Sequence, residues 1–190
     1  MLDLHAITPS CAVLLGQDTA GRFEHLGSAW CVDHHAWVTS WNVAVPPENA
    51  VVMSVQDGTI ATISAWEFDA GLAGFTAALE APPLTTRRTG DLTKRDRLWA
   101  LGFPDVINHP ALRLARGSLD PARYFPYVCP WTVQGHLALF AASQGWLTGR
   151  CYPGMEGGPV LDEAGAVVGV LASSPASPDH PPLARFHRLA

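Results

Sequence analysis

Residues 153–173 read PGMEGGPVLDEAGAVVGVLAS, and this stretch is the most informative part of the sequence about the fold. It opens on a loop with glycines at 154, 157 and 158, where the backbone can take positive φ or pack closely. Two short apolar runs follow, around Val160 and Val168, with the polar residues DEAG between them. Short β-branched runs bounded by Gly, Asp and Ser are typical of strands. We therefore predict a glycine loop followed by two strands.

Runs of the same kind recur along the rest of the chain. Further strands are predicted from Cys11, His25, Ala36, Ala50, Ile60 and Leu72, and near Leu98, Leu114, Leu139 and Leu147. No repeat of solenoid or propeller length is present. The pattern alone leaves open a β-sandwich or a pair of small barrels.

One polar, proline-marked segment, 81–97, interrupts the strand pattern and predicts a connection between two lobes. We expect an N-terminal domain over residues 1–85 and a C-terminal domain over 86–190. The Pro- and Ser-rich tail from about residue 173 is expected to wrap the surface or to be partly loose.

Charge and composition narrow the class of partner. The formal net charge is −5, and the 12 basic residues form no run that would follow a phosphate backbone. We therefore expect no nucleic acid as main ligand. The start, MLDLHAITPS, lacks the basic and apolar parts of a secretory signal, and no stretch is long and apolar enough for a membrane span. A cytoplasmic protein without membrane contact is predicted.

The cysteines and histidines give little sign of a metal centre. The four cysteines form no CxxC pair and are expected to be buried free thiols. His34 and His35 lie near Cys31, but neighbours on a strand point to opposite faces. We expect no metal and no cofactor.

Three segments, in this order, resemble trypsin-like serine peptidases, particularly the bacterial branch close to the HtrA-type proteases. GSAWCVDHHAWVTSWNV (27–43) resembles the stretch that delivers the catalytic histidine. LWALGFPD (98–105), followed by LARGSL from Leu114, resembles the first strands of the second barrel. The glycine loop resembles the nucleophile loop. The resemblance covers about residues 11–172 and implies an all-β fold of two six-stranded antiparallel barrels of the chymotrypsin type.

The same resemblance implies that the catalytic residues are absent. Asn42 stands where the histidine is expected, and Glu156 where the serine is expected. The acid is either replaced by Gly71 or displaced to Asp69. A carboxamide cannot act as the general base, and a carboxylate is a poor nucleophile for peptide acyl transfer. We interpret the chain as a pseudoprotease with no catalytic residue.

Gly154, Met155, Glu156 and Gly157 are, by the same resemblance, the remnant of the oxyanion loop. One hypothesis is that the Glu156 carboxylate folds back and accepts N–H groups of its own loop. The alternative is a solvated surface residue. Trp41, next to Asn42, is a candidate for binding in the cleft. Five other tryptophans are expected in the core or at barrel ends: Trp37, Trp66, Trp99, Trp131 and Trp146.

The leading functional interpretation is a subunit that binds a protein or peptide partner by β-addition or acts as a scaffold, in a bacterial regulatory or defence complex. One alternative is an active hydrolase with a rearranged site, built from His34, His35, His109 or His136 with Ser40, Ser143 or Cys151. Another is a subunit that a partner completes, with the tail from Ser173 as the docking segment.

Overall fold

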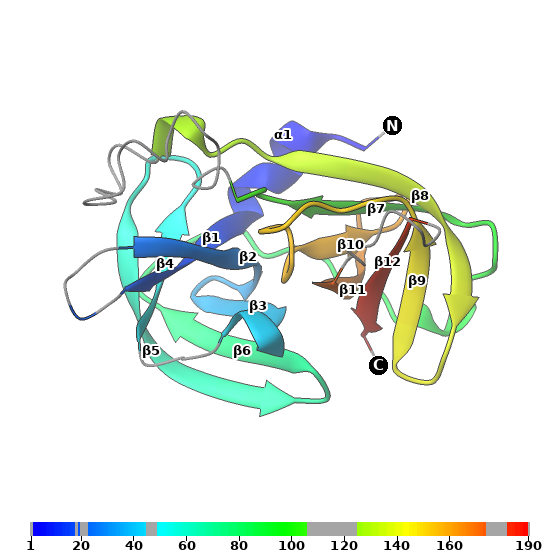
Figure 1. Cartoon of the computed structure of the whole chain (residues 1–190), viewed down its shortest axis with the longest axis horizontal. Helices are drawn as coiled ribbons and strands as arrows, with labels where there is room; N and C mark the ends of the chain where they lie inside the picture. The colour runs from blue at the N-terminus through cyan, green and yellow to red at the C-terminus, as the bar shows by residue number, and fades with distance from the viewer. Residues whose placement is uncertain are drawn as a thin grey trace.

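The computed structural model of the chain contains two closed antiparallel β-barrels, which lie side by side in Figure 1. It describes residues 2–17, 19, 23–44, 49–105, 125–173 and 182–189. The first barrel is on the left of Figure 1 in blue to green, and the second is on the right in green to red. The predicted pair of six-stranded barrels is confirmed, and the sandwich is excluded.

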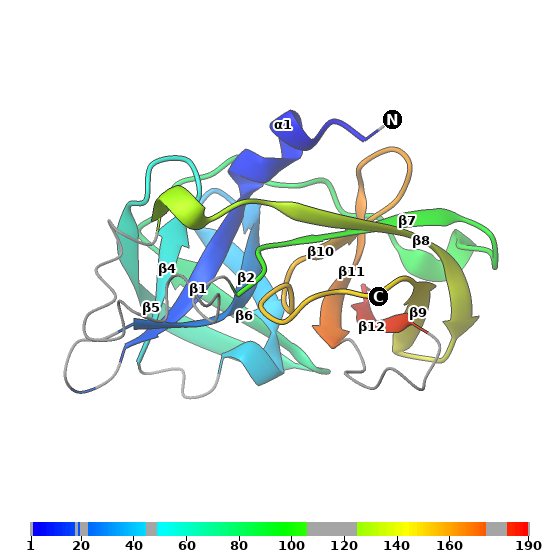
Figure 2. The same cartoon turned by 45° about the horizontal axis from the view of Figure 1, so that its top comes forward.

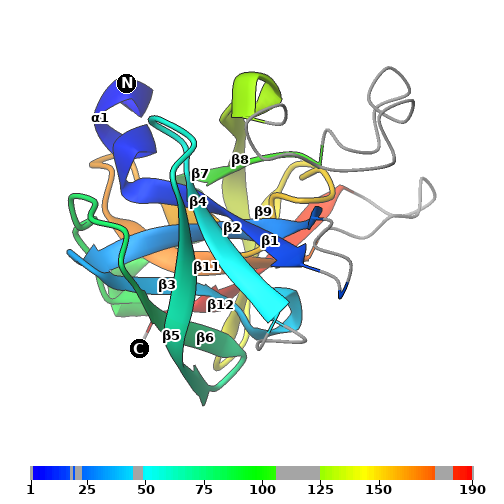
Figure 3. The same cartoon turned by 90° about the vertical axis from the view of Figure 1, so that its left-hand side faces the viewer.

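The first barrel uses the N-terminal half of the chain, and Figure 3 views the molecule from its side. Its strands are β1 (Cys11–Gln17), β2 (Phe23–Asp33), β3 (Ala36–Ser40), β4 (Ala50–Ser54), β5 (Ile60–Asp69) and β6 (Leu72–Ala77). They follow the order β1-β2-β3-β6-β5-β4, and pairing of β4 with β1 closes the barrel. All six begin within two residues of the predicted starts.

The second barrel repeats the strand order of the first. Its strands are β7 (Arg97–Gly102), β8 (Trp131–Phe140), β9 (Gln144–Thr148), β10 (Pro159–Leu161), β11 (Val167–Ser173) and β12 (Leu183–Arg188). They follow the order β7-β8-β9-β12-β11-β10, and β10 pairs with β7. The strand predicted near Leu114 lies outside the described residues.

Strand β12 corrects the expectation that the tail beyond Ser173 only covers the surface or is loose. Leu183–Arg188 pairs with β11 on one side and β9 on the other, so the end of the tail completes the barrel. Its alternating burial, with Ala184 and Phe186 inside, is the ordinary pattern of a barrel strand. The docking role proposed for the tail therefore cannot apply to these residues without opening the barrel.

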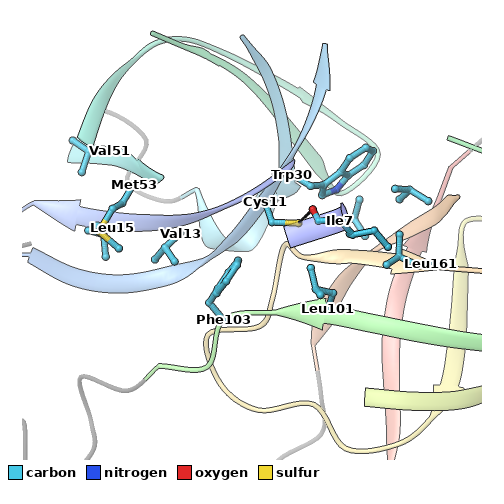
Figure 4. Close-up of a cluster of buried hydrophobic side chains, with 12 residues drawn as sticks. Ile7, Cys11, Val13, Leu15, Trp30, Val51, Met53, Leu101, Phe103 and Leu161 are labelled. Carbon is cyan, nitrogen blue, oxygen red and sulfur yellow. Dashed lines mark hydrogen bonds between the residues drawn. The ribbon is translucent and has the colours of Figure 1, made fainter. Parts of the chain in front are cut away.

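One hydrophobic cluster, shown in Figure 4, contains buried residues of both barrels. Alternate side chains of β1 serve different clusters: Ala12 and Leu14 belong to a cluster of first-barrel residues, whereas Cys11, Val13 and Leu15 belong to a second cluster. That second cluster also contains Leu101 and Leu161 from the second barrel. Because β1 is buried on both faces, its sequence is continuously apolar instead of alternating.

Short helical turns and the connecting segment complete the described structure. Helix α1 (Leu4–Ile7) is capped by Asp3, whose carboxylate accepts the His5 N–H at 3.0 Å, and it continues into η1 (Thr8–Ser10). Figure 2 shows both above the two barrels. Turns η2 (Trp41–Val43), η4 (Thr89–Asp91) and η5 (Phe125–Tyr127) lie between strands.

The predicted domain boundary between residues 85 and 86 falls in the segment between β6 and β7. This segment is anchored to both barrels: the Leu84 N–H donates to the Cys31 carbonyl of the first at 2.9 Å, and the Arg87 N–H donates to the Val167 carbonyl of the second at 2.8 Å. None of the helices among the described residues has the length and apolar character needed to cross a membrane.

Candidate functional site

The glycine loop lies between β9 and β10 and is held by both barrels. The Ser28 N–H of β2 donates to the Glu156 carbonyl at 2.7 Å, and the Gly157 N–H donates to the Leu171 carbonyl of β11 at 2.7 Å. The loop is the gold segment between the barrels in Figure 2. Any side chain at position 156 is therefore presented at the junction of the two barrels.

Gly157 packs too tightly against the first barrel to carry a side chain. A Cβ atom at this position would overlap the Thr39 hydroxyl of β3 and the Ser28 carbonyl of β2. The backbone here also has a φ of +87°, which L side chains rarely adopt. Packing alone therefore accounts for glycine at this position, whatever chemistry the loop performs.

A hydrogen bond to the Pro153 carbonyl fixes the direction of the Gly154 N–H, which belongs to the same peptide group. The Asp105 N–H donates to the Pro153 carbonyl at 2.7 Å. A trans peptide points its N–H opposite to its carbonyl, so the Gly154 N–H points away from Asp105. The Gly154 carbonyl is fixed as well, because the buried Ser28 hydroxyl donates to it at 2.9 Å and His25 Nε2 lies 3.1 Å from it.

The Glu156 side chain turns back onto this N–H. Gly154 N donates to Glu156 Oε2 at 2.8 Å, and the carboxylate also interacts with its own backbone N–H. Burial raises the pKa of the Glu156 carboxyl, and the two backbone hydrogen bonds oppose that rise. The folded-back conformation is confirmed, and the solvated alternative is wrong: the side chain is half-buried and hydrogen-bonded.

Asn42 lies in η2 with both ends of its amide engaged. Its Oδ1 accepts from the buried Ser40 hydroxyl, and its Nδ2 donates to the Ala172 carbonyl of β11 at 3.3 Å. Leu171 and Ala172 thus accept from Gly157 and Asn42 respectively, which places η2 and the glycine loop at the same part of β11. The structure brings the segments of Asn42 and Glu156 together across the barrel junction.

Of the two positions considered for the acid, Gly71 lies beside the Asn42 segment. The Trp41 N–H donates to the Gly71 carbonyl at 3.1 Å. Asp69 is the last residue of β5, pairs with Leu72 and is exposed. Of these two residues, Gly71 is the one that makes a hydrogen bond with the segment that contains Asn42.

Among the described residues, those considered for a rearranged hydrolase do not converge. His34 and His35 form the turn between β2 and β3, not a strand as assumed, and both are exposed. His136 is exposed on β8, Ser143 is exposed between β8 and β9, and His109 lies outside the described residues. The hydroxyl of Ser40 donates to Asn42, which is no base.

Cys151 is also unsuited to nucleophilic chemistry. The thiol is buried, and this burial, with the nearby Glu156 charge, raises its pKa to about 12. A thiol with such a pKa is almost entirely protonated at neutral pH. Cys11 and Cys31 are buried as expected, whereas Cys129 is exposed, contrary to expectation.

The tryptophans expected in the core or at barrel ends differ in their exposure. Trp37 is buried and Trp41 is 51% exposed, in line with a core and a surface role respectively. Trp131, the first residue of β8, is 49% exposed and is therefore not a core residue. Its ring packs edge-on against Tyr152, which immediately precedes the glycine loop. Trp66, Trp99 and Trp146 are partly buried.

Two histidines at the site were not found from the sequence. His25 lies against Gly154, and its pKa is lowered by burial despite the opposing charge of Asp105. His187 of β12 lies against Gly71. Neither belongs to a local motif, and both reach the site only through contacts between residues far apart in the chain.

Two antiparallel six-stranded barrels with a glycine loop held at their junction define the chymotrypsin-type class of double-barrel proteins. The sequence profile described as the trypsin-like peptidase domain matches residues 27–170, more than half of the chain. The chain belongs to the trypsin-like peptidase family. No curated protein matches its sequence at a significant level.

Solved structures with the same fold include two bacterial-type proteases. The HtrA-type protease AlgW with a decapeptide superposes with a TM-score of 0.70 at 16% identity, over 97% of this chain and 62% of AlgW. Rv3671c protease from M. tuberculosis in its active form gives 0.72 at 15% identity, over 97% of this chain and 78% of that chain. The chain thus spans less than two thirds of AlgW.

Proposed function

We propose that this chain is a catalytically inactive trypsin-like domain that binds a protein or peptide partner. The observation that carries the proposal is the hydrogen bond from Gly154 N to Glu156 Oε2. In an acyl transfer site, backbone N–H groups of this kind receive the developing negative charge of the substrate oxygen. Here a resident carboxylate already accepts one of them.

The surroundings of Glu156 support the loss of hydrolysis. The position matched to the base is Asn42, whose amide is held by Ser40 and Ala172. The position matched to the acid is Gly71, which has no side chain to orient a base. A working site needs a nucleophile, a base and usually a group that orients the base, and all three positions carry other residues.

Binding is supported by the surface next to these residues. Trp41 follows β3 at the junction and is 51% exposed, and large exposed aromatic residues are enriched where proteins bind partners. One structural neighbour, AlgW, was solved with a decapeptide. A peptide that contacts Trp41 does not need the N–H group occupied by Glu156.

The proposed setting is a bacterial, cytoplasmic multi-protein regulatory or defence complex. The proteases of similar fold include one from M. tuberculosis, which supports a bacterial setting. A subunit that has kept its fold while its catalytic positions have changed is suited to recognition within such an assembly.

The absence of catalysis is tested with a fluorophosphonate probe and a fluorogenic peptide library. We expect neither labelling nor cleavage above that of heat-denatured protein. The proposal fails if labelling is saturable and is abolished by one substitution, such as Ser40→Ala or Ser143→Ala, that leaves the fold intact.

Binding is tested by selecting decapeptides from a displayed library on the wild-type chain. Affinity for Trp41→Ala should fall by about tenfold or more, as for an aromatic hot spot. Tyr127→Ala is the matched control, because Tyr127 is 52% exposed and lies in η5, a different turn. Unchanged affinity in Trp41→Ala would remove the cleft surface from the proposal.

A further inference from the structure

His187 occupies the space that a side chain at position 71 would need. A Cβ atom on Gly71 would lie 2.7 Å from His187 Nδ1 and 2.9 Å from Nε2, and closer still to Cε1 between them. These three distances place the Cβ over the flat face of the imidazole, above Cε1, so the ring face covers Gly71. Real Cβ atoms essentially never approach another heavy atom this closely.

The imidazole cannot easily move aside. His187 is 7% exposed and belongs to β12, which is paired to both β9 and β11. Phe186, its neighbour, is fully buried in the second barrel, which fixes the strand. The ring that blocks position 71 of the first barrel therefore belongs to a strand of the second barrel that is paired on both sides.

One of the two ring nitrogens of His187, Nδ1, makes no hydrogen bond to any described residue. His187 Nδ1 is buried and unpaired among the described residues. Burial, together with the charge of Arg185, lowers the pKa of the ring and favours its neutral form. The ring gains no bond from facing Gly71 and acts there by its volume.

We infer that His187 holds the acid position of the disabled site closed, so that no acidic side chain can stand at 71 while the imidazole is present. This inference rests on the proposed function for the meaning of position 71. It extends the loss of catalysis from three positions to four: 42, 71, 156 and 187. Restoring the three matched residues alone would leave the acid without space.

Packing is tested by a double-mutant cycle on the full chain. Gly71→Ala, His187→Ala and the double variant are compared by their unfolding equilibrium constants in urea. We expect the effect of Gly71→Ala to be roughly tenfold smaller when His187 is replaced. If Gly71→Ala does not fold alone, recovery of folding in the double variant is the equivalent result.

The matched control is Gly165→Ala in both backgrounds. Gly165 has a φ of +82°, close to the +90° of Gly71, but a Cβ there would meet nothing nearer than 3.6 Å. Gly165→Ala therefore measures how far an L residue at positive φ destabilises the fold when no side chain blocks its Cβ. Equal effects of Gly71→Ala with and without His187 would overturn the inference.

Reactivation tests the functional meaning. Asn42→His, Gly71→Asp and Glu156→Ser are combined, with and without His187→Ser, and fluorophosphonate labelling is measured. We expect labelling at least several-fold faster when His187 is also replaced. Labelling of both variants at the same measurable rate would contradict the inference. If the cycle shows coupling but neither variant is labelled, the packing of His187 on Gly71 is supported and the match to the catalytic positions in the proposed function fails.

Discussion

Glu156 affects the candidate site in two ways, and a small neutral residue would share only the first of them. In the proposed function it stands in place of the nucleophile, and its carboxylate accepts the Gly154 N–H that a substrate oxygen would otherwise use. An alanine at this position would leave that N–H open to water or to an anionic ligand. The Glu156 side chain therefore satisfies this N–H without a ligand.

The pH dependence of stability should report this carboxyl. Its pKa is raised in the folded protein, so the folded state holds more protons than the unfolded state above the ordinary carboxyl pKa of about 4.3. Its contribution to stability is present at low pH and is lost as pH rises through the folded-state pKa. Relative to Glu156→Gln, the wild type should lose stability over this range in urea unfolding. A constant difference across pH would contradict the buried carboxyl.

His187 should give the opposite trend. Its pKa is lowered in the folded protein, so the unfolded state binds more protons below the ordinary histidine pKa of about 6.5. The wild type should lose stability as pH falls below this value more steeply than His187→Gln. His136→Gln, on the exposed side of β8, is the control for removing a histidine without touching the buried site. Parallel curves for wild type and His187→Gln would disprove this.

Strand β12 is required to close the second barrel, which makes the end of the chain structural. Truncation after Ser173 removes β12 and exposes the edges of β9 and β11. We expect this variant to aggregate or to bind a hydrophobic dye. Replacing residues 174–181 with a Gly-Ser segment of equal length keeps β12 and should leave thermal unfolding nearly unchanged. A truncated chain that remains soluble and folded would refute the role of β12.

The strands of the first barrel were predictable because each is a compact apolar run between polar turns. β12 was missed because Pro181 and Pro182 precede it, although Leu183–Arg188 alternates in burial as strands do. Helix α1 was missed because it has only four residues and owes its start to the single cap at Asp3. Local sequence signals identify elements best when composition changes at their ends.

The site was predictable only where it is local in sequence. Asn42 and Glu156 stand within recognisable motifs, and the fold-back of Glu156 follows from the spacing of two residues to Gly154. The contact of Gly71 with the Trp41 N–H was not predictable, because it joins two turns that are far apart in the chain. His187 was out of reach, because nothing near it in the chain indicates that its ring meets Gly71 in the other barrel.

The shared core should make the two barrels unfold together. Leu161 of the second barrel is fully buried and belongs to the same cluster as Val13 and Leu15 of the first. Leu161→Ala should lower the free energy of unfolding by about 2–5 kcal/mol. Leu139→Ala is the control, because Leu139 is 49% exposed and such positions change stability by about 0.5 kcal/mol or less.

The shape of the transition decides whether the core is shared energetically. A single transition should persist in Leu161→Ala, with tryptophan fluorescence and far-ultraviolet circular dichroism moving together. Two separated transitions, with only one of them shifted, would show that the barrels fold independently.

The tight approach of Gly157 to Thr39 and Ser28 has a consequence for how chains of this kind are recognised in genomes. When packing alone requires a glycine, that glycine does not indicate whether the surrounding residues are catalytic. Sequence searches that score only the glycines of this loop will therefore retrieve active enzymes and inactive homologues together. Under the proposed function, separating them requires scoring the residues at 42, 71, 156 and 187.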